Sequence, residues 1–193
     1  MPITPSRLAC LCRWWLAALL CCTTWNTAAQ SAAVPWILVD SKKQTLSVIK
    51  DGEIQVRFYG IAIGRGGTGP VRTRGDAKTP VGEFRVAWIN PDSQYTLFFG
   101  LDFPNLDYAT RALDQRLIDE QEFVAIKRAL MEQRTPPQDT RLGGNIGIHG
   151  VGRNGDARIH EGFNWTDGCV ALTDQQIHVL AQWVKLGTKV IIN

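Results

Sequence analysis

The chain has 193 residues, of which 45% are hydrophobic, and carries a formal net charge of +3 at pH 7. There is no internal repeat and no low-complexity linker, which excludes a repeat architecture and favours one folded domain with a real core. The small net charge gives no indication of a nucleic-acid-binding surface.

Residues 1–29 have the organisation of a secretory signal peptide. Arg7 and Arg13 precede an apolar run from Trp14 to Cys22, and small residues near Ala29 supply a cleavage site. The run is too short to span a bilayer as a helix. We therefore expect export to the periplasm or cell envelope, with no stable membrane insertion after removal of the signal. An uncleaved anchor and a lipoprotein are the alternatives.

Removal of residues 1–29 would leave a domain of residues 30–193 with 19 basic and 18 acidic residues. The segment removed contains four of the five cysteines, so that Cys169 is the single cysteine of this domain. In an oxidising compartment a lone thiol cannot form an internal disulfide. It is either a buried small hydrophobic residue or a reactive group, and its neighbours must decide between them.

Strand patterns dominate the first half of this domain. Asp51-Gly52 separates two alternating apolar runs, which predicts a β-hairpin. The strands that we expect are 36–39, 45–50, 54–58, 83–88 and 190–192.

Helical patterns follow in the second half. Asp119 with Glu122 forms a capping-box pattern within a helical insertion that we expect from about Asp107 to Arg134. Thr173 with Gln176 predicts a second helix start, an apolar stripe runs from 177 to 184, and Gly187 suits the C-terminal cap. The fold class is therefore mainly β (α+β), with a helical insertion and one helix near the C-terminus.

Two segments carry candidate chemistry, Gly147-Ile148-His149-Gly150 and Trp165-Thr166-Asp167-Gly168-Cys169-Val170. A thiol becomes an effective nucleophile when a base or a positive environment converts it to a thiolate, and imidazole is such a base at neutral pH. The neighbouring glycines allow close approach of a substrate, and the helix that follows could contribute backbone N–H groups to an oxyanion site.

These segments resemble the L,D-transpeptidase (YkuD-type) family, whose motif is a histidine, fourteen to seventeen residues, and Ser/Thr-His-Gly-Cys. Here sixteen residues separate His149 from Thr166, and Asp76 to Phe84 is similar to the family's Thr-Pro-x-Gly-x-Phe segment. The resemblance covers Trp36 to Asn193 and implies a β-sandwich-like domain. It also implies that Cys169 is the nucleophile, that His149 is the general base, and that the Gly150 carbonyl orients the imidazole.

The chain departs from the family pattern at three positions. Asp167 replaces the motif histidine, Ala171 replaces an arginine that commonly follows the cysteine, and Asp174 replaces an asparagine. The motif also resembles the branch with amidases that release lipoprotein from peptidoglycan. These departures favour hydrolysis relative to cross-linking.

Other polar groups near the motif are candidate oxyanion or substrate-binding residues: Thr166, Asp167, Gly168, Arg153 and His160. A solvated loop histidine is the favoured interpretation of His160. A zinc site of His149, His160 and Cys169 lacks close-paired ligand spacing, so that we expect no metal and no cofactor.

Three functional hypotheses follow. The first is an L,D-transpeptidase that forms an acyl-enzyme on peptidoglycan stem peptides, and the second is an amidase or carboxypeptidase acting on the same type of linkage. The third is a non-catalytic cell-wall binding module. The expected partners are stem peptides and, for the amidase, a cell-wall-linked lipoprotein, with no nucleic acid.

Overall fold

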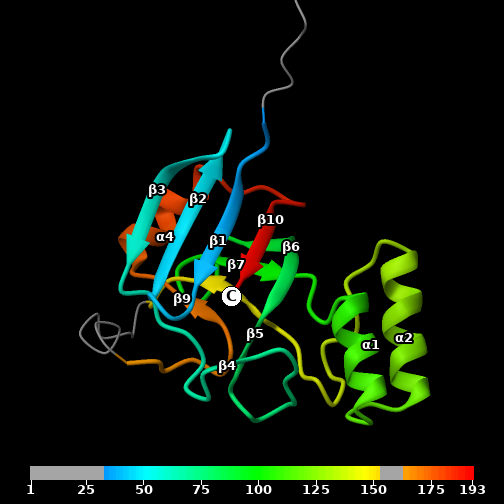
Figure 1. Cartoon of the computed structure of the whole chain (residues 1–193). Helices are drawn as coiled ribbons and strands as arrows, with labels where there is room; N and C mark the ends of the chain where they lie inside the picture. The colour runs from blue at the N-terminus through cyan, green and yellow to red at the C-terminus, as the bar shows by residue number, and fades with distance from the viewer. Residues whose placement is uncertain (1–32, 153–162) are drawn as a thin grey trace, which may run out of the picture. The chain divides into compact units, whose positions relative to one another are not determined.

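The computed structural model describes residues 33–152 and 163–193 (Figure 1). The expected signal peptide and the two candidate loop residues, Arg153 and His160, lie outside these ranges. In the described part of the chain, no helix combines the length and the apolar character required to cross a membrane.

The described domain is built on a sheet with the strand order β3-β2-β1-β10-β6-β7-β8-β9. A small parallel pair, β4 with β5, stands apart from it. The strand bounds are β1 Trp36–Asp40, β2 Thr45–Lys50, β3 Glu53–Tyr59, β4 Thr68–Gly69, β5 Thr79–Pro80, β6 Gly82–Asn90, β7 Phe98–Leu101, β8 Gly147–His149, β9 Val170–Ala171 and β10 Lys189–Ile192.

The predicted hairpin is confirmed between β2 and β3. Its two turn residues, Asp51 and Gly52, have φ angles of 55° and 79°. Positive φ at both central positions is the conformation that matches the twist of the flanking strands, and Asp-Gly adopts it readily.

The centre of the sheet joins the two ends of the described domain. β1 pairs in parallel with β10, which pairs antiparallel with β6 on its other side. The strands β1, β10 and β6 lie side by side in Figure 1. Alternate side chains of these strands, including Ile37, Phe84 and Val190, are buried in one apolar core.

Helices α1 (Leu106–Asp114) and α2 (Glu120–Met131) form the expected insertion between β7 and β8. Asp119 caps α2 by accepting a hydrogen bond from the Glu122 backbone N–H. The Glu122 carboxylate binds Arg141 rather than completing a capping box. In both figures this helix pair lies at the opposite end of the domain from α4.

Helix α4 (Asp174–Ala181) begins with the predicted capping box between Thr173 and Gln176. The prediction that Gly187 caps this helix is wrong. The helix ends at Ala181, and Gly187 instead donates its backbone N–H to Val86 in β6. Its positive φ of 80° serves the turn that leads into β10.

The mainly β fold with a helical insertion is confirmed, and eight strands of the described residues join in one sheet. The sequence did not predict β7, β8 or β9, which are short and carry no clear alternation. These are the strands that position the candidate site.

Candidate active site

The pairing of β8 with β9 brings the two motif segments together. The strands are parallel, with His149 opposite Ala171. Cys169 comes directly before β9. The strand pairing therefore brings the segment that carries the thiol next to the strand that carries the imidazole.

The ring of His149 is buried and held by its own backbone neighbour. Its Nδ1 atom lies 2.6 Å from the carbonyl oxygen of Gly150. A carbonyl oxygen only accepts hydrogen bonds, so Nδ1 carries the proton of this bond. In the neutral ring the lone pair is then on Nε2, which leaves that nitrogen as the basic one.

The backbone at Gly150 is closely surrounded by other residues, which leaves no room for a side chain at this position. A Cβ atom there would lie 2.4 Å from the Asp174 carboxylate and 2.8 Å from the Tyr95 carbonyl oxygen. Asp174 accepts the backbone N–H of Gly152 at 3.0 Å. The first turn of α4 therefore packs against the segment that orients the imidazole.

Three aromatic side chains surround His149. Tyr95 and Phe98 stack on it with ring centroids at 4.4 Å and 5.9 Å, and Trp165 approaches edge-on at 5.8 Å. Such packing restricts the orientation of the imidazole. Sequence reasoning gave these residues no role, because Tyr95 and Phe98 lie in a segment far from His149 in the sequence, although the aromatic pattern around Tyr95 to Phe99 was a usable signal.

The Cys169 residue is partly exposed, and its sulfur donates a hydrogen bond to the Asn145 carbonyl oxygen at 3.3 Å. Burial of the thiol raises its pKa to about 11, while the Gly147 backbone N–H and Arg72 act to lower it and Asp167 acts to raise it. At neutral pH the resting group is therefore a thiol, and it needs a base to become a nucleophile.

The loop that carries the thiol is closed by a hydroxyl group. Thr166 Oγ1 accepts the Gly168 backbone N–H at 3.2 Å and donates to the Cys169 carbonyl at 2.6 Å. Gly168 has a φ angle of 130°, a conformation that favours glycine. Thr166 thus stabilises the backbone conformation of this loop.

Asp167 points away from this loop and pairs with Arg65 at 2.7 Å, with both side chains well exposed. A cavity of about 520 Å³ opens beside it. The residues that line it are Arg65, Arg72, Arg74, Gly75, Ala77, Gln138, Asp139, Gly143, Gly144, Asn145 and Asp167. Because Asn145 also contacts the sulfur, this cavity adjoins Cys169.

Within residues 33–152 and 163–193, no three His, Cys, Asp or Glu side chains gather closely enough to hold a metal ion.

The described domain is mainly β, with His149 at the end of β8 and Cys169 directly before β9. The model of the YkuD L,D-transpeptidase catalytic domain family matches residues 34–192, and the chain belongs to this family. No curated protein matches the chain.

Two solved structures share the fold. The helical cell shape determining protein Pgp2 from Campylobacter jejuni is 24% identical, with a TM-score of 0.56, and the match covers 84% of this chain and 48% of that one. Bd1075 from Bdellovibrio bacteriovorus is 23% identical, with a TM-score of 0.50 and the same two coverages. The chain therefore spans about half the length of these proteins.

Proposed function

We propose that this protein is an exported peptidoglycan-modifying L,D-transpeptidase that acts through an acyl-enzyme on Cys169. The observation that supports the proposal is the pairing of β8 with β9: Cys169 directly precedes the strand that pairs with His149, and the imidazole bonds to the Gly150 carbonyl. Membership of the YkuD family supports the same chemistry and a cell-wall substrate.

In the proposed reaction, Nε2 of His149 takes the thiol proton as sulfur attacks the peptide carbonyl on the L-centre of a stem peptide. A C–S bond forms, the carbonyl becomes an oxyanion, and the C–N bond then breaks. The imidazolium returns the proton to the leaving amine, which departs as D-alanine. A second amine then attacks the thioester, and sulfur leaves as the regenerated thiol.

Hydrolysis is the second candidate, because water can replace the acceptor amine in the last step. The observation that favours it is Ala171, which is fully buried opposite His149 and carries no charge with which to hold a peptide carboxylate. In that case the product is a free carboxylic acid. An envelope-linked lipoprotein would be a candidate substrate of such an amidase.

Intact-mass spectrometry with purified disaccharide-tetrapeptide and disaccharide-tripeptide tests the proposal. We expect an acyl adduct that maps to Cys169 and a cross-linked product. In a reaction with disaccharide-tetrapeptide alone, formation of tripeptide without cross-links would favour hydrolysis. Cys169→Ala is expected to fold, as judged by circular dichroism, and to form neither adduct nor product. Comparable turnover by the alanine variant would exclude the cysteine mechanism.

The role of the base has its own test. If His149 activates the thiol, His149→Gln should slow alkylation of Cys169 near neutral pH, whereas His178→Gln, an exposed histidine on α4, should not. Identical pH profiles for the wild type and His149→Gln would remove His149 from the mechanism, and His160→Gln would then be compared.

A further inference from the structure

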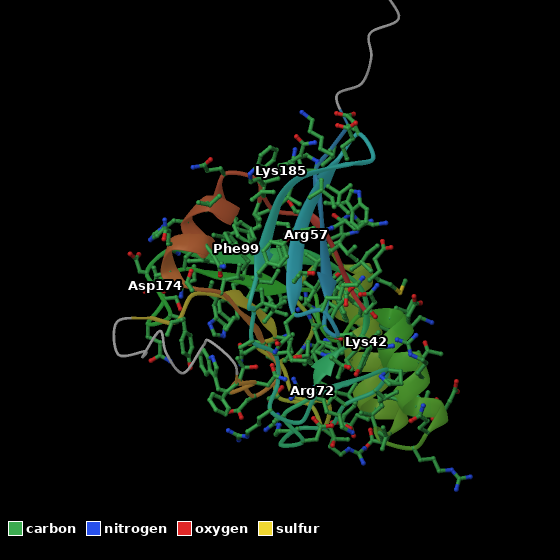
Figure 2. All side chains as sticks on the ribbon, turned by 60° about the vertical axis from the view of Figure 1, so that its left-hand side comes forward. Lys42, Arg57, Arg72, Phe99, Asp174 and Lys185 are labelled. Carbon is green, nitrogen blue, oxygen red and sulfur yellow. The ribbon has the colours of Figure 1, made fainter. Side chains whose placement is uncertain are left out.

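Arg72 is a buried cation directly behind the nucleophile loop, and nothing in the motif analysis pointed to it. Its side chain is 5% exposed, and its guanidinium lies over the Phe103 ring at 5.7 Å from the centroid. Figure 2 shows Arg72 in the lower part of the domain, far from Lys185. A charge that is removed from water in this way requires compensation from its surroundings.

The guanidinium contacts the two residues that precede Cys169. Its Nη2 atom donates to the Asp167 carbonyl oxygen at 3.3 Å. Its Nη1 atom lies against Gly168, where an added Cβ atom would approach it to 2.6 Å. The cation thus lies beside the peptide that joins Asp167 to Gly168.

The charge of Arg72 is only partly compensated. Its Nε atom is 3.7 Å from the Asp76 carboxylate, too far for a hydrogen bond. That carboxylate already accepts the backbone N–H groups of Thr73 at 2.9 Å and Lys78 at 3.0 Å. Among the residues that the structure describes, the buried Nε and Nη1 atoms of Arg72 have no hydrogen-bond partner.

We propose that Arg72 is a positioning residue that holds the Asp167–Gly168 peptide and supplies a fixed positive charge for the Cys169 thiolate. The proposal rests on the proposed function, in which Cys169 is the nucleophile. Because Nε and Nη1 are closed to solvent, they face the protein's own loop rather than a ligand in the adjoining cavity. An anion that forms on the sulfur would be stabilised by this nearby cation.

The other charges around the thiol fit this arrangement. Arg72 lowers the pKa of Cys169, and Asp167 opposes it, although the Asp167 carboxylate is itself paired with Arg65. Asp76 and Tyr108 also interact electrostatically with Arg72, and His149 lies in β8, the strand that pairs with β9. Among these groups, Arg72 is the buried cation.

The test is the pH profile of Cys169 alkylation by iodoacetamide, mapped by peptide mass spectrometry in the full chain. We expect Arg72→Gln, which retains an N–H donor without the charge, to slow alkylation about tenfold at pH 8, since one unit of thiol pKa changes the thiolate population tenfold. Arg72→Lys should recover most of the rate. Arg128→Gln, at an exposed arginine on α2, should match the wild type.

A folded Arg72→Gln variant with the wild-type profile would overturn the proposal, as would an Arg72→Lys variant as slow as Arg72→Gln. If Arg72→Gln does not fold, the alkylation rate of Asp76→Asn tests the proposal instead. The Asp76 carboxylate lies near Nε and offsets part of the positive charge of Arg72. Without it, Arg72 should stabilise the thiolate more strongly and alkylation should be faster. An unchanged or slower rate would overturn the proposal. Alkylation needs no peptidoglycan, so a failure of the proposed function is seen separately, as absent turnover in the wild type.

Discussion

The imidazole of His149 stacks on the ring of Tyr95, with centroids 4.4 Å apart and planes inclined by 30°. Tyr95→Ala should loosen the imidazole and lower kcat about tenfold or more, because small losses of alignment are costly in catalysis. Tyr95→Phe, which retains the ring, should stay near the wild type. The measurement is kcat and KM for tetrapeptide turnover, and equal rates for the two variants would show that the stacking does not matter.

Gly168→Ala should destabilise the domain strongly. Its φ of 130° is unfavourable for alanine, and the new Cβ atom would lie 2.6 Å from both Arg72 Nη1 and the Lys78 carbonyl oxygen. We expect the strain and the clash together to cost about 3 kcal/mol in the free energy of unfolding.

Gly60→Ala is the matched control for this substitution. Gly60 has a φ of 68° and open space where the Cβ atom would lie. We expect a cost of about 1 kcal/mol, from backbone strain alone. Urea unfolding compares the two variants, and equal losses would show that the contacts with Arg72 and Lys78 relax freely.

The stability of the domain should depend on pH through Cys169. Burial raises the pKa of its thiol from 9.0 to about 11, so the folded state holds this proton more tightly than the unfolded state does. This contribution to stability is complete below pH 9 and is lost as the pH rises towards 11. Urea midpoints of the wild type should therefore fall more steeply over that interval than those of Cys169→Ala. Parallel curves would contradict the raised pKa.

Meropenem should acylate Cys169, because its strained lactam is a reactive amide and the proposed site accepts an acyl group. Opening of the lactam forms a C–S bond and adds the whole inhibitor to the mass of the protein. We expect slower capture than in a family member with arginine at position 171, since a charged partner for the carboxylate is absent. Intact mass and peptide mapping give the result, with Cys169→Ala as the control.

Local patterns predicted the elements whose contacts are close in the sequence. The Asp51-Gly52 hairpin and the Thr173 capping box are decided within a few residues, and both are observed. The helix end at Gly187 was predicted wrongly because the turn into β10 bonds to Val86, a partner about a hundred residues away. Sheet contacts of this kind leave no local signal.

The candidate site also contains residues that local patterns predicted and one that depends on long-range contacts. Cys169 and His149 were found from their spacing, and in the structure His149 ends β8 while Cys169 directly precedes β9, its neighbour in the sheet. Their catalytic roles stay predictions. Arg72 gave no signal, because it lies in a segment with Arg65, Arg74 and Lys78 that reads as a solvated charged loop. Arg72 differs from those three residues in being buried, and its burial results from packing against residues that are distant in the sequence.

The position of β10 has a consequence for how the domain is made. This last strand lies between β1 and β6, so that without it the sheet falls into two groups, β3-β2-β1 and β6-β7-β8-β9. The group that carries His149 and Cys169 would then share no strand pairing with the N-terminal hairpin, and Ala62, just after β3, would still bond to Ala171 in β9. During synthesis the thiol and the imidazole therefore cannot gain the support of a complete sheet until β10 has left the ribosome.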